Sequence, residues 1–500
     1  MSRLSLPALI AAAFALVLRP ALAVEPPITV VQPFLAGTLD PAVSTEGWAL
    51  QSHGIAETLF TVASDGTVTP QIAESAEPAA DGSWTVRLRP NWKFSDGTPV
   101  DAAAVRDSLL DGTERNPLAL SQTGRMEIDV ADPLTLKITT AKPVPALRSV
   151  LAEYFHVIHK RRPAPAEAGG ERLVFTGPYR VTQFRKDDRV ELEPNPHSPL
   201  PGRRAPVIVR KLVDAQARAL ALESGDADLA FQLPPESLDR LRGRGVRVGS
   251  TLVGYQYLLF LNGKRPGLSE QPVRQAIDLA INRAALVAAL RGGEVATGFY
   301  PKFYRFAAQE PRPYEPERAA KLLDDAGWKR GIDGIRTKGA DRLAFTLLSV
   351  TQAAEYGYMA LLIKDDLAKI GIAIEVKGVE RSLPFLMAGD FDIGFNFTHA
   401  APGGDPAFVM EQFFRSTAPR NYGKVPLPGL DAVLDELAQT RDLGQRDALA
   451  QKAQSMIFEQ APAVFLMTPV WHTGLSARLP GYKPYPSDYY IVQADMGLAP

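Results

Sequence analysis

Residues 81–105 are DGSWTVRLRPNWKFSDGTPVDAAAV. Apolar and polar side chains alternate from Trp84 to Leu88, which predicts a strand, and the two Asp-Gly pairs predict tight turns. A second short strand is expected at 92–94, and Asp101 is well placed to cap the helix that follows it. The stretch thus predicts strand, turn, strand and capped helix. It contains no residue set typical of catalysis.

The same stretch resembles a signature of the extracytoplasmic solute-binding proteins of the peptide/nickel class (family 5), which feed ABC importers. Other motifs follow in the order that the family has them. Thr176-Gly177-Pro178-Tyr179 resembles its G-T-G-P-Y strand start, and residues 225–229 resemble its G-x-x-D strand. The resemblance extends over nearly the whole chain after its first residues. It implies a binding protein rather than an enzyme.

Composition narrows the class of protein. A chain of 500 residues exceeds one ordinary core and predicts two or three domains. The 55 basic and 56 acidic residues give a net charge of −1 without long charge runs, which argues against a nucleic-acid partner. The chain has no cysteine, which excludes disulfides, thiolate metal sites, cysteine nucleophiles and a lipid-modified cysteine anchor.

The N-terminus predicts an export signal. Arg3 precedes an apolar run from Leu4 to Leu18, and Ala21-Leu22-Ala23 fits the small-x-small cleavage rule. We therefore expect residues 1–23 to be a signal peptide, cleaved near Ala23. No later segment is long and apolar enough to span a bilayer. The expected location is the periplasm, without a lipid anchor.

Strands alternate with helices along the chain, mostly in β-α-β order, which predicts an α/β fold. The family resemblance makes this expectation specific: a two-lobed periplasmic binding protein (type II, cluster C) with an additional third lobe. The expected boundaries are residues 24–50, 173–245 and 470–500 for a discontinuous lobe I, 51–172 for lobe II, and 246–469 for lobe III.

The resemblance also implies a mechanism without covalent change. The ligand binds between lobes, the lobes close by a hinge, and the closed form docks on an ABC permease in the inner membrane. We expect the two hinge crossings near 247–251 and 462–469. The protein is expected to be a monomer that needs no cofactor.

Ligand contacts are expected from two loops. Thr45, Glu46, Gly47 and Trp48 match the lobe I loop that touches peptide backbone in the family. In lobe III, peptide-binding members carry an aromatic residue, an aspartate that pairs with the ligand's α-amino group, and a G-D-P turn. Here His399 takes the aromatic place, the turn is kept at 404–406, and Pro402 or a small neighbour replaces the aspartate.

Three aromatic residues are further candidates for lining the cleft, although aromatic side chains on strands are more often core. They are Tyr255, Phe397 and Trp471.

The expected ligand is a short peptide or peptide-like solute, and a metal chelate such as nickel with an organic chelator is the closest alternative. A free amine in a closed, dry cleft needs a counter-charge. Either Glu46 supplies it, or the ligand lacks a free amine or is an anionic chelate that His399 contacts. We favour the second possibility, because Glu46 has no matching precedent in the family.

Alternatives of other classes remain open at this point. A periplasmic hydrolase would need a nucleophile–base pair or a metal triad, and the chain lacks G-x-S-x-G, Walker and H-E-x-x-H motifs. A metal site is conceivable at Glu153, His156 and His159, whose spacing would place them on one side of a helix. However, the sequence YFHVIHK is more typical of a strand, in which Glu153 and His159 share one face and His156 lies on the other. A chaperone or signalling subunit with the same fold is the third alternative.

Overall fold

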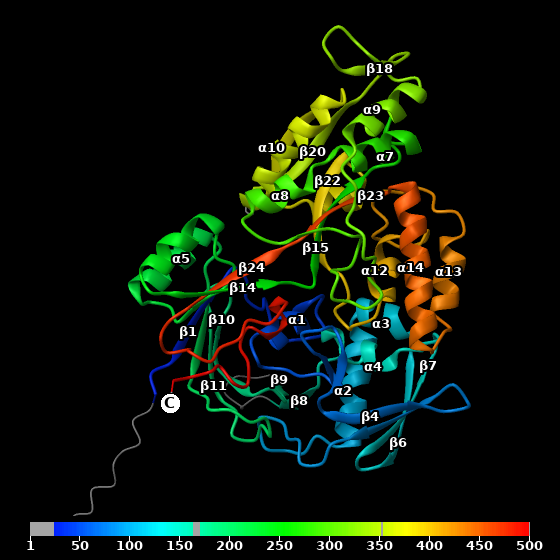
Figure 1. The fold of residues 1–500 in the computed structure, drawn as a ribbon. Helices are drawn as coiled ribbons and strands as arrows, with labels where there is room; N and C mark the ends of the chain where they lie inside the picture. The colour runs from blue at the N-terminus through cyan, green and yellow to red at the C-terminus, as the bar shows by residue number, and fades with distance from the viewer. Residues whose placement is uncertain (1–24, 164–170, 352–353, 500) are drawn as a thin grey trace, which may run out of the picture.

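The computed structural model describes residues 25–163, 171–351 and 354–499. The predicted signal peptide, residues 1–23, lies outside these ranges. Three lobes are visible in Figure 1: one at the top, one at lower left and one at lower right. Within the described ranges, every helix is too short or too polar to cross a membrane.

Lobe I, at lower left, is built around a seven-stranded mixed sheet in the order β10-β11-β12-β1-β13-β24-β14. Apolar side chains on one face pack under α5 and α6, and those on the other face form the core of the lobe. Its elements are β1 (Ile28–Gln32), α1 (Glu46–Ser52), β10 (Tyr179–Arg185), β11 (Arg189–Pro194), β12 (Val207–Lys211), α5 (Ala215–Ser224), β13 (Leu229–Ala230), η2 (Pro235–Ser237), α6 (Leu238–Gly243), β14 (Arg247–Leu252), β24 (Val470–Leu475) and η3 (Asp488–Tyr490).

Three features differ from the expected boundaries of lobe I. Residues 173–175, expected in lobe I, belong to a hairpin with residues 159–163 that is part of lobe II. Strand β14, expected in lobe III, pairs along its whole length with β24 in the lobe I sheet. Ile55 and Ala56, expected in lobe II, are buried in the core of lobe I. β14 is an edge strand without a fully buried side chain, so its sequence has no strong apolar pattern to show which sheet it joins.

Lobe II, at lower right, contains a four-stranded antiparallel sheet in the order β4-β5-β7-β6, packed against α2, with two separate hairpins. Its elements are β2 (Phe60–Val62), β3 (Val68–Pro70), β4 (Ala73–Pro78), β5 (Trp84–Leu88), α2 (Ala102–Arg115), α3 (Pro117–Thr123), β6 (Met126–Asp132), β7 (Thr135–Thr140), α4 (Leu147–Val150), η1 (Tyr154–His156), β8 (His159–Pro163) and β9 (Glu171–Phe175).

The stretch 81–105 forms the centre of lobe II. Strand β5 is confirmed, and the Asp101 carboxylate caps α2 by accepting a hydrogen bond of 2.8 Å from the Ala104 N–H. The second expected strand is wrong, because residues 92–94 contribute only an isolated bridge at Lys93. Trp92 is held instead by its side chain, whose Nε1–H donates to the buried Glu57 carboxylate at 3.1 Å.

Lobe III, at the top, is a six-stranded sheet in the order β16-β23-β15-β22-β20-β21 with helices on both faces. Helices α7 to α10 cover one face and α11 to α14 the other. Its elements are β15 (Tyr255–Leu261), α7 (Gln271–Ala280), α8 (Arg283–Ala289), β16 (Glu294–Val295), α9 (Pro316–Asp325), β17 (Lys329–Arg330), β18 (Arg336–Lys338), β19 (Asp341–Arg342), β20 (Ala344–Val350), α10 (Ala354–Lys369), β21 (Ala373–Val379), α11 (Leu383–Ala388), β22 (Ile393–His399), α12 (Ala407–Phe413), α13 (Leu430–Leu437), α14 (Leu443–Gln460) and β23 (Ala463–Thr468).

The chain crosses between the lobe I and lobe III sheets twice, at residues 253–254 and at Pro469. The two crossings lie side by side, since the Val253 N–H donates to the Pro469 carbonyl at 3.1 Å. The second crossing lies within the expected range of 462–469. The first lies just after the expected 247–251, which is occupied by β14.

Candidate binding cleft

Four of the predicted site residues meet beside the two crossings. Tyr255 begins β15, His399 ends β22, and the antiparallel register pairs the two directly. Trp471, near the start of β24, reaches them from the lobe I sheet. The Tyr255 ring centroid lies 4.9 Å from that of His399, 4.8 Å from Trp471 and 5.9 Å from Phe397. These side chains form an aromatic cluster that bridges lobes I and III.

The C-terminal segment completes this cluster, which the sequence did not reveal. The Tyr255 hydroxyl donates to the buried Asp488 carboxylate at 2.7 Å, and the Tyr489 ring lies 5.1 Å from His399. Burial raises the pKa of Asp488 to about 6. The run YPSDYY at 485–490 was the available signal, because three tyrosines around an acid are unusual in a surface tail.

The predicted lobe I loop forms the start of α1. Thr45 precedes the helix without a side-chain capping bond, and Trp48 stacks on Phe34 with ring centroids 4.3 Å apart. The Glu46 carboxylate accepts a hydrogen bond of 2.7 Å from the Gly37 N–H. This bond stabilises the loop that precedes α1. Gly47 packs against lobe II so closely that a Cβ there would lie 2.2 Å from the Tyr154 carbonyl oxygen.

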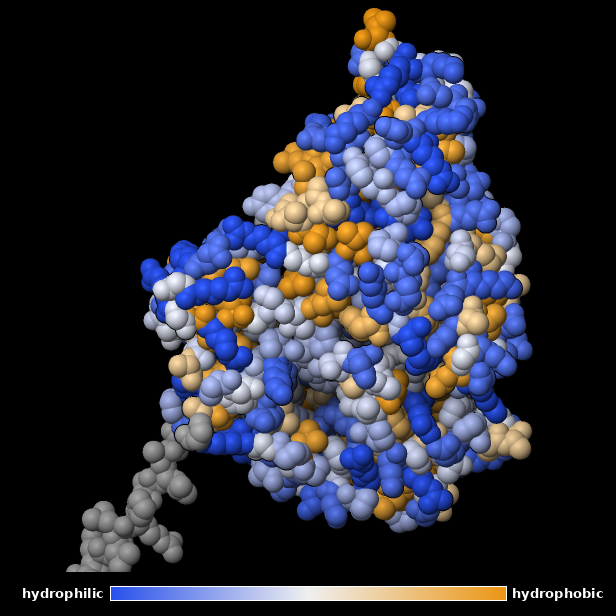
Figure 2. Space-filling view, in the orientation of Figure 1, coloured by the Kyte–Doolittle hydropathy of each residue, from blue (hydrophilic) through white to orange (hydrophobic). Residues whose placement is uncertain are grey.

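A cavity of about 480 Å³ separates lobe I from lobe III and extends from the aromatic cluster. Trp471 and Tyr257 form part of its wall, together with the segment before α5, the turn at η2 and the first turn of α10. Figure 2 shows a hollow on this face between the lobe that carries α5 and the upper lobe, bordered by hydrophobic residues. The volume lies within the range of cavities that hold small molecules.

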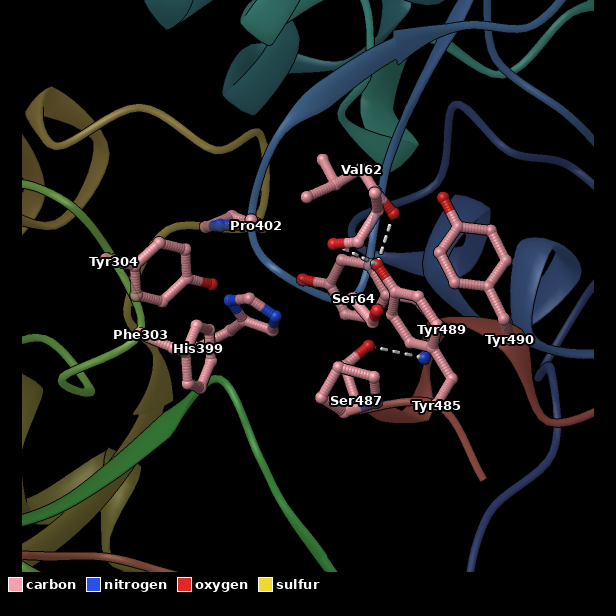
Figure 3. A pocket seen from close by; sticks show the side chains of 13 residues that line it. Val62, Ser64, Phe303, Tyr304, His399, Pro402, Tyr485, Ser487, Tyr489 and Tyr490 are labelled. Carbon is pink, nitrogen blue, oxygen red and sulfur yellow. Dashed lines mark hydrogen bonds between the residues drawn. The ribbon is translucent and has the colours of Figure 1, made fainter. Parts of the chain in front are cut away.

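The other end of the cluster is closed. Figure 3 shows His399, Tyr304 and Pro402 of lobe III facing the lobe II hairpin turn and the C-terminal tyrosines. The cavity left among them is about 10 Å³, the size needed for one water molecule. The Tyr485 hydroxyl stabilises this junction by donating a hydrogen bond to the Val62 carbonyl oxygen.

His399 lies half-buried in this junction as a neutral ring. Burial lowers its pKa to about 3, and its Nδ1 has no hydrogen-bond partner among the described residues. It can therefore donate or accept one hydrogen bond, but it cannot offer a positive charge at physiological pH.

Asp405, in the predicted G-D-P turn, is structural. One carboxylate oxygen accepts from the Ala407 N–H at 2.8 Å at the start of α12, and the other accepts from the buried Arg446 guanidinium at 2.5 Å. This pair fixes the loop that carries His399.

The metal-site alternative is not supported by the geometry. Glu153 and His156 both bind Gln122, whereas His159 Nε2 contacts the Asp111 carboxylate at 2.9 Å. The expected strand is wrong for its first residues, because 154–156 form a single 3₁₀ turn and β8 begins at His159. In the part of the chain that the structure describes, no three histidine or acidic side chains converge as metal ligands do.

Glu153 gives the fold a pH dependence that can be measured. Burial raises its pKa from 4.5 to about 8, so the folded chain binds this proton more tightly than the unfolded chain. Stability should then fall as the pH rises from about 4.5 to 8. Glu153→Gln should remove that part of the slope and leave the variant more stable than the wild type at pH 8, by on the order of a few kcal/mol. Urea unfolding of the wild type and the variant at pH 5 and pH 8 measures this. If both proteins lose the same free energy of unfolding between the two pH values, the prediction is contradicted.

Known proteins resemble this chain in sequence over most of its length. Residues 67–421 match the bacterial extracellular solute-binding proteins, family 5, middle region. The glutathione-binding protein GsiB of Escherichia coli K12 is 26% identical over 435 residues, which cover 82% of each chain.

Solved structures share the fold over nearly the full length. NikA from Brucella suis in complex with Fe(III)-EDTA has a TM-score of 0.82 and 25% identity, and the match covers 95% of this chain and 100% of NikA. The nickel ABC transporter protein from Bacillus halodurans has a TM-score of 0.75 and 28% identity, covering 93% and 98%. AppA of Bacillus subtilis with a nonapeptide, 20% identical at a TM-score of 0.75, supports the fold alone.

Proposed function

The chain belongs to the family 5 bacterial extracellular solute-binding proteins, and from that membership we propose that it binds a short peptide or peptide-like solute between lobes I and III. As a member of this family it is a substrate-binding protein of an ABC importer, with the α/β fold predicted from its sequence. The observation that carries the proposal is the cavity of about 480 Å³, whose walls come from both lobes beside the two chain crossings.

The closing movement follows from the same geometry. Two adjacent crossings let lobes I and III rotate toward each other while their sheets stay rigid. Closure would bury the solute against Trp471 and Tyr257 and form the surface that docks on the permease. We further propose that the protein is exported with cleavage near Ala23 and acts as a periplasmic monomer.

A metal chelate is the second candidate, favoured by the likeness to NikA and by the nitrogen ligand that His399 offers. Two observations weigh against it. His399 lies in the closed junction of about 10 Å³ rather than in the open cleft. The open cleft has Glu236 and Glu355 in its wall, and both would repel an anionic chelate.

A hydrolase function is disfavoured, because the serine–histidine–aspartate group that the structure brings together lies away from the cleft. Ser108, His159 and Asp111 are in contact, with the Ser108 Oγ 3.2 Å from His159 Nδ1. However, Ser108 is buried, and its Oγ accepts a hydrogen bond from the His159 backbone N–H. None of the three residues lines the cleft. We therefore propose that the solute leaves the protein chemically unchanged.

The test is titration calorimetry of the mature protein with glutathione, with tripeptides and with nickel–histidine, followed by mass analysis of the recovered solute. We expect saturable one-to-one binding of peptide-like solutes and recovery of the same mass. Binding of nickel–histidine alone would favour the chelate. Cleavage of a peptide, or no binding by any of the three classes, would overturn the proposal.

A further inference from the structure

The wall of the open cleft contains three carboxylates and, among its described residues, no lysine or arginine. Two of the three are used within the fold. The Asp214 carboxylate caps α5 by accepting from the Ala217 N–H at 2.7 Å. The Glu236 carboxylate accepts from the Gln216 side-chain amide at 2.8 Å. Glu355 accepts the longest hydrogen bond of the three, 3.4 Å from the Tyr257 hydroxyl.

Glu355 lies in the first turn of α10 and has no cationic partner. Within the described ranges, no basic side chain lies within 4.0 Å of its carboxylate, and its hydrogen bond from the Tyr257 hydroxyl is long, at 3.4 Å. The cation that acts on it electrostatically is Arg218. That guanidinium is held by four backbone carbonyls of lobe I, at 2.7–2.8 Å. Glu355 is half-buried in the cavity wall, and a carboxylate whose nearest cation is bound elsewhere is stabilised when a ligand cation binds beside it.

The surrounding side chains suit a cation as well. Tyr257, Tyr358 and Trp471 line the same cavity, and aromatic faces attract ammonium and guanidinium groups. Tyr257 and Trp471 are buried, whereas Tyr358 is exposed on the solvent side. An acid beside aromatic walls is a combination that recognises a cationic organic group.

Two further observations point independently to a ligand at this place. His472, which lines the cavity, is 4% exposed; its Nδ1 pairs with Ser250 at 2.8 Å, but its Nε2 has no partner among the described residues. Gln232, also in the wall, has a φ of +53°, a conformation that L residues rarely adopt. Such strain costs about 1–3 kcal/mol and occurs mainly at functional sites.

We propose that Glu355 forms the cation subsite of this cleft, so that the solute carries an ammonium or guanidinium group there. The inference rests on the proposed function and narrows it to cationic peptides or peptide-like molecules. The cation comes either from the peptide's α-amino group or from a lysine or arginine side chain. Both share the chemistry that Glu355 and the aromatic wall recognise.

The test offers two tripeptide pools to the mature protein, one with free and one with acetylated N-termini, and identifies retained peptides by native mass spectrometry. Among acetylated peptides, we expect those with lysine or arginine to be enriched at least about tenfold over those with norleucine. Glu355→Gln should remove the enrichment and weaken binding of the selected peptides by about 10–100-fold, the usual contribution of a charge-assisted hydrogen bond. Glu317→Gln is the matched control, because Glu317 is an exposed glutamate in the first turn of α9 and lies outside the cleft wall; it should change affinity less than about threefold.

The outcomes separate this inference from the proposed function. If only free N-termini give Glu355-dependent retention, the α-amino group is the cation. If peptides are retained without preference for a cation, or if Glu355→Gln keeps the preference, the subsite is refuted while peptide binding stands. Spermidine is a third probe: its Glu355-dependent binding without any peptide retention would keep the subsite and refute the peptide. No retention of any probe would overturn both.

Discussion

Replacing Asp405 by alanine should lower the free energy of unfolding by about 3–5 kcal/mol, the range for breaking a buried ion pair. The Arg446 side chain is only 2% exposed and pairs with Asp405 at 2.5 Å, so its charge would be left buried without a counter-ion. The variant would also lose the acceptor for the Ala407 N–H. Urea unfolding followed by circular dichroism measures the change.

The control for this experiment is Asp435→Ala, which breaks an ion pair with Arg415 at the surface. Asp435 is 61% exposed, and exposed pairs contribute about 1 kcal/mol or less. Asp405→Asn adds a second comparison, because it removes the charge but keeps an oxygen for Ala407. If Asp405→Ala costs no more than Asp435→Ala, the pair with Arg446 does not fix the loop that carries His399.

Replacing Trp471 by alanine should weaken solute binding by at least about 30-fold, which corresponds to the 2 kcal/mol or more of an aromatic hot spot. Trp471 belongs both to the cleft wall and to the cluster around Tyr255, where it also meets Phe231 edge-on at 5.5 Å. The loss of its core contacts should cost about 3–5 kcal/mol of stability as well. Calorimetry at a temperature where the variant remains folded measures the affinity.

Trp328→Ala separates the two effects. Trp328 is 1% exposed in the core of lobe III, so its removal should cost a similar amount of stability without touching the cleft. We expect its affinity to stay within about threefold of the wild type. Equal affinity of Trp471→Ala and Trp328→Ala would show that the solute does not lie against Trp471.

Much of the fold was predictable because its signals are local. The alternation in β5 and the Asp101 cap of α2 each involve neighbouring residues. The assignment of β14 failed because an edge strand with half-exposed side chains fits either sheet. Which sheet it joins is decided by β24, more than 200 residues later.

The candidate site was only half predictable for the same reason. Tyr255, Phe397 and Trp471 were candidates from their residue type, but the hydrogen bond from Tyr255 to Asp488 depends on how the C-terminal segment folds back. Glu46 was a candidate counter-charge, yet its carboxylate is bound by its own loop. Glu355 was missed because a glutamate at a helix start looks like an ordinary surface residue until lobe I is placed opposite it.

The most direct measurement is a crystal structure of the mature protein with a solute that calorimetry has shown to bind. The central claim is that solute is held intact between lobes I and III. We expect density for the unaltered solute in the cleft between Tyr257 and Trp471, with both lobes in contact with it. Solute bound outside this cleft, or found there as a cleaved product, would contradict the claim.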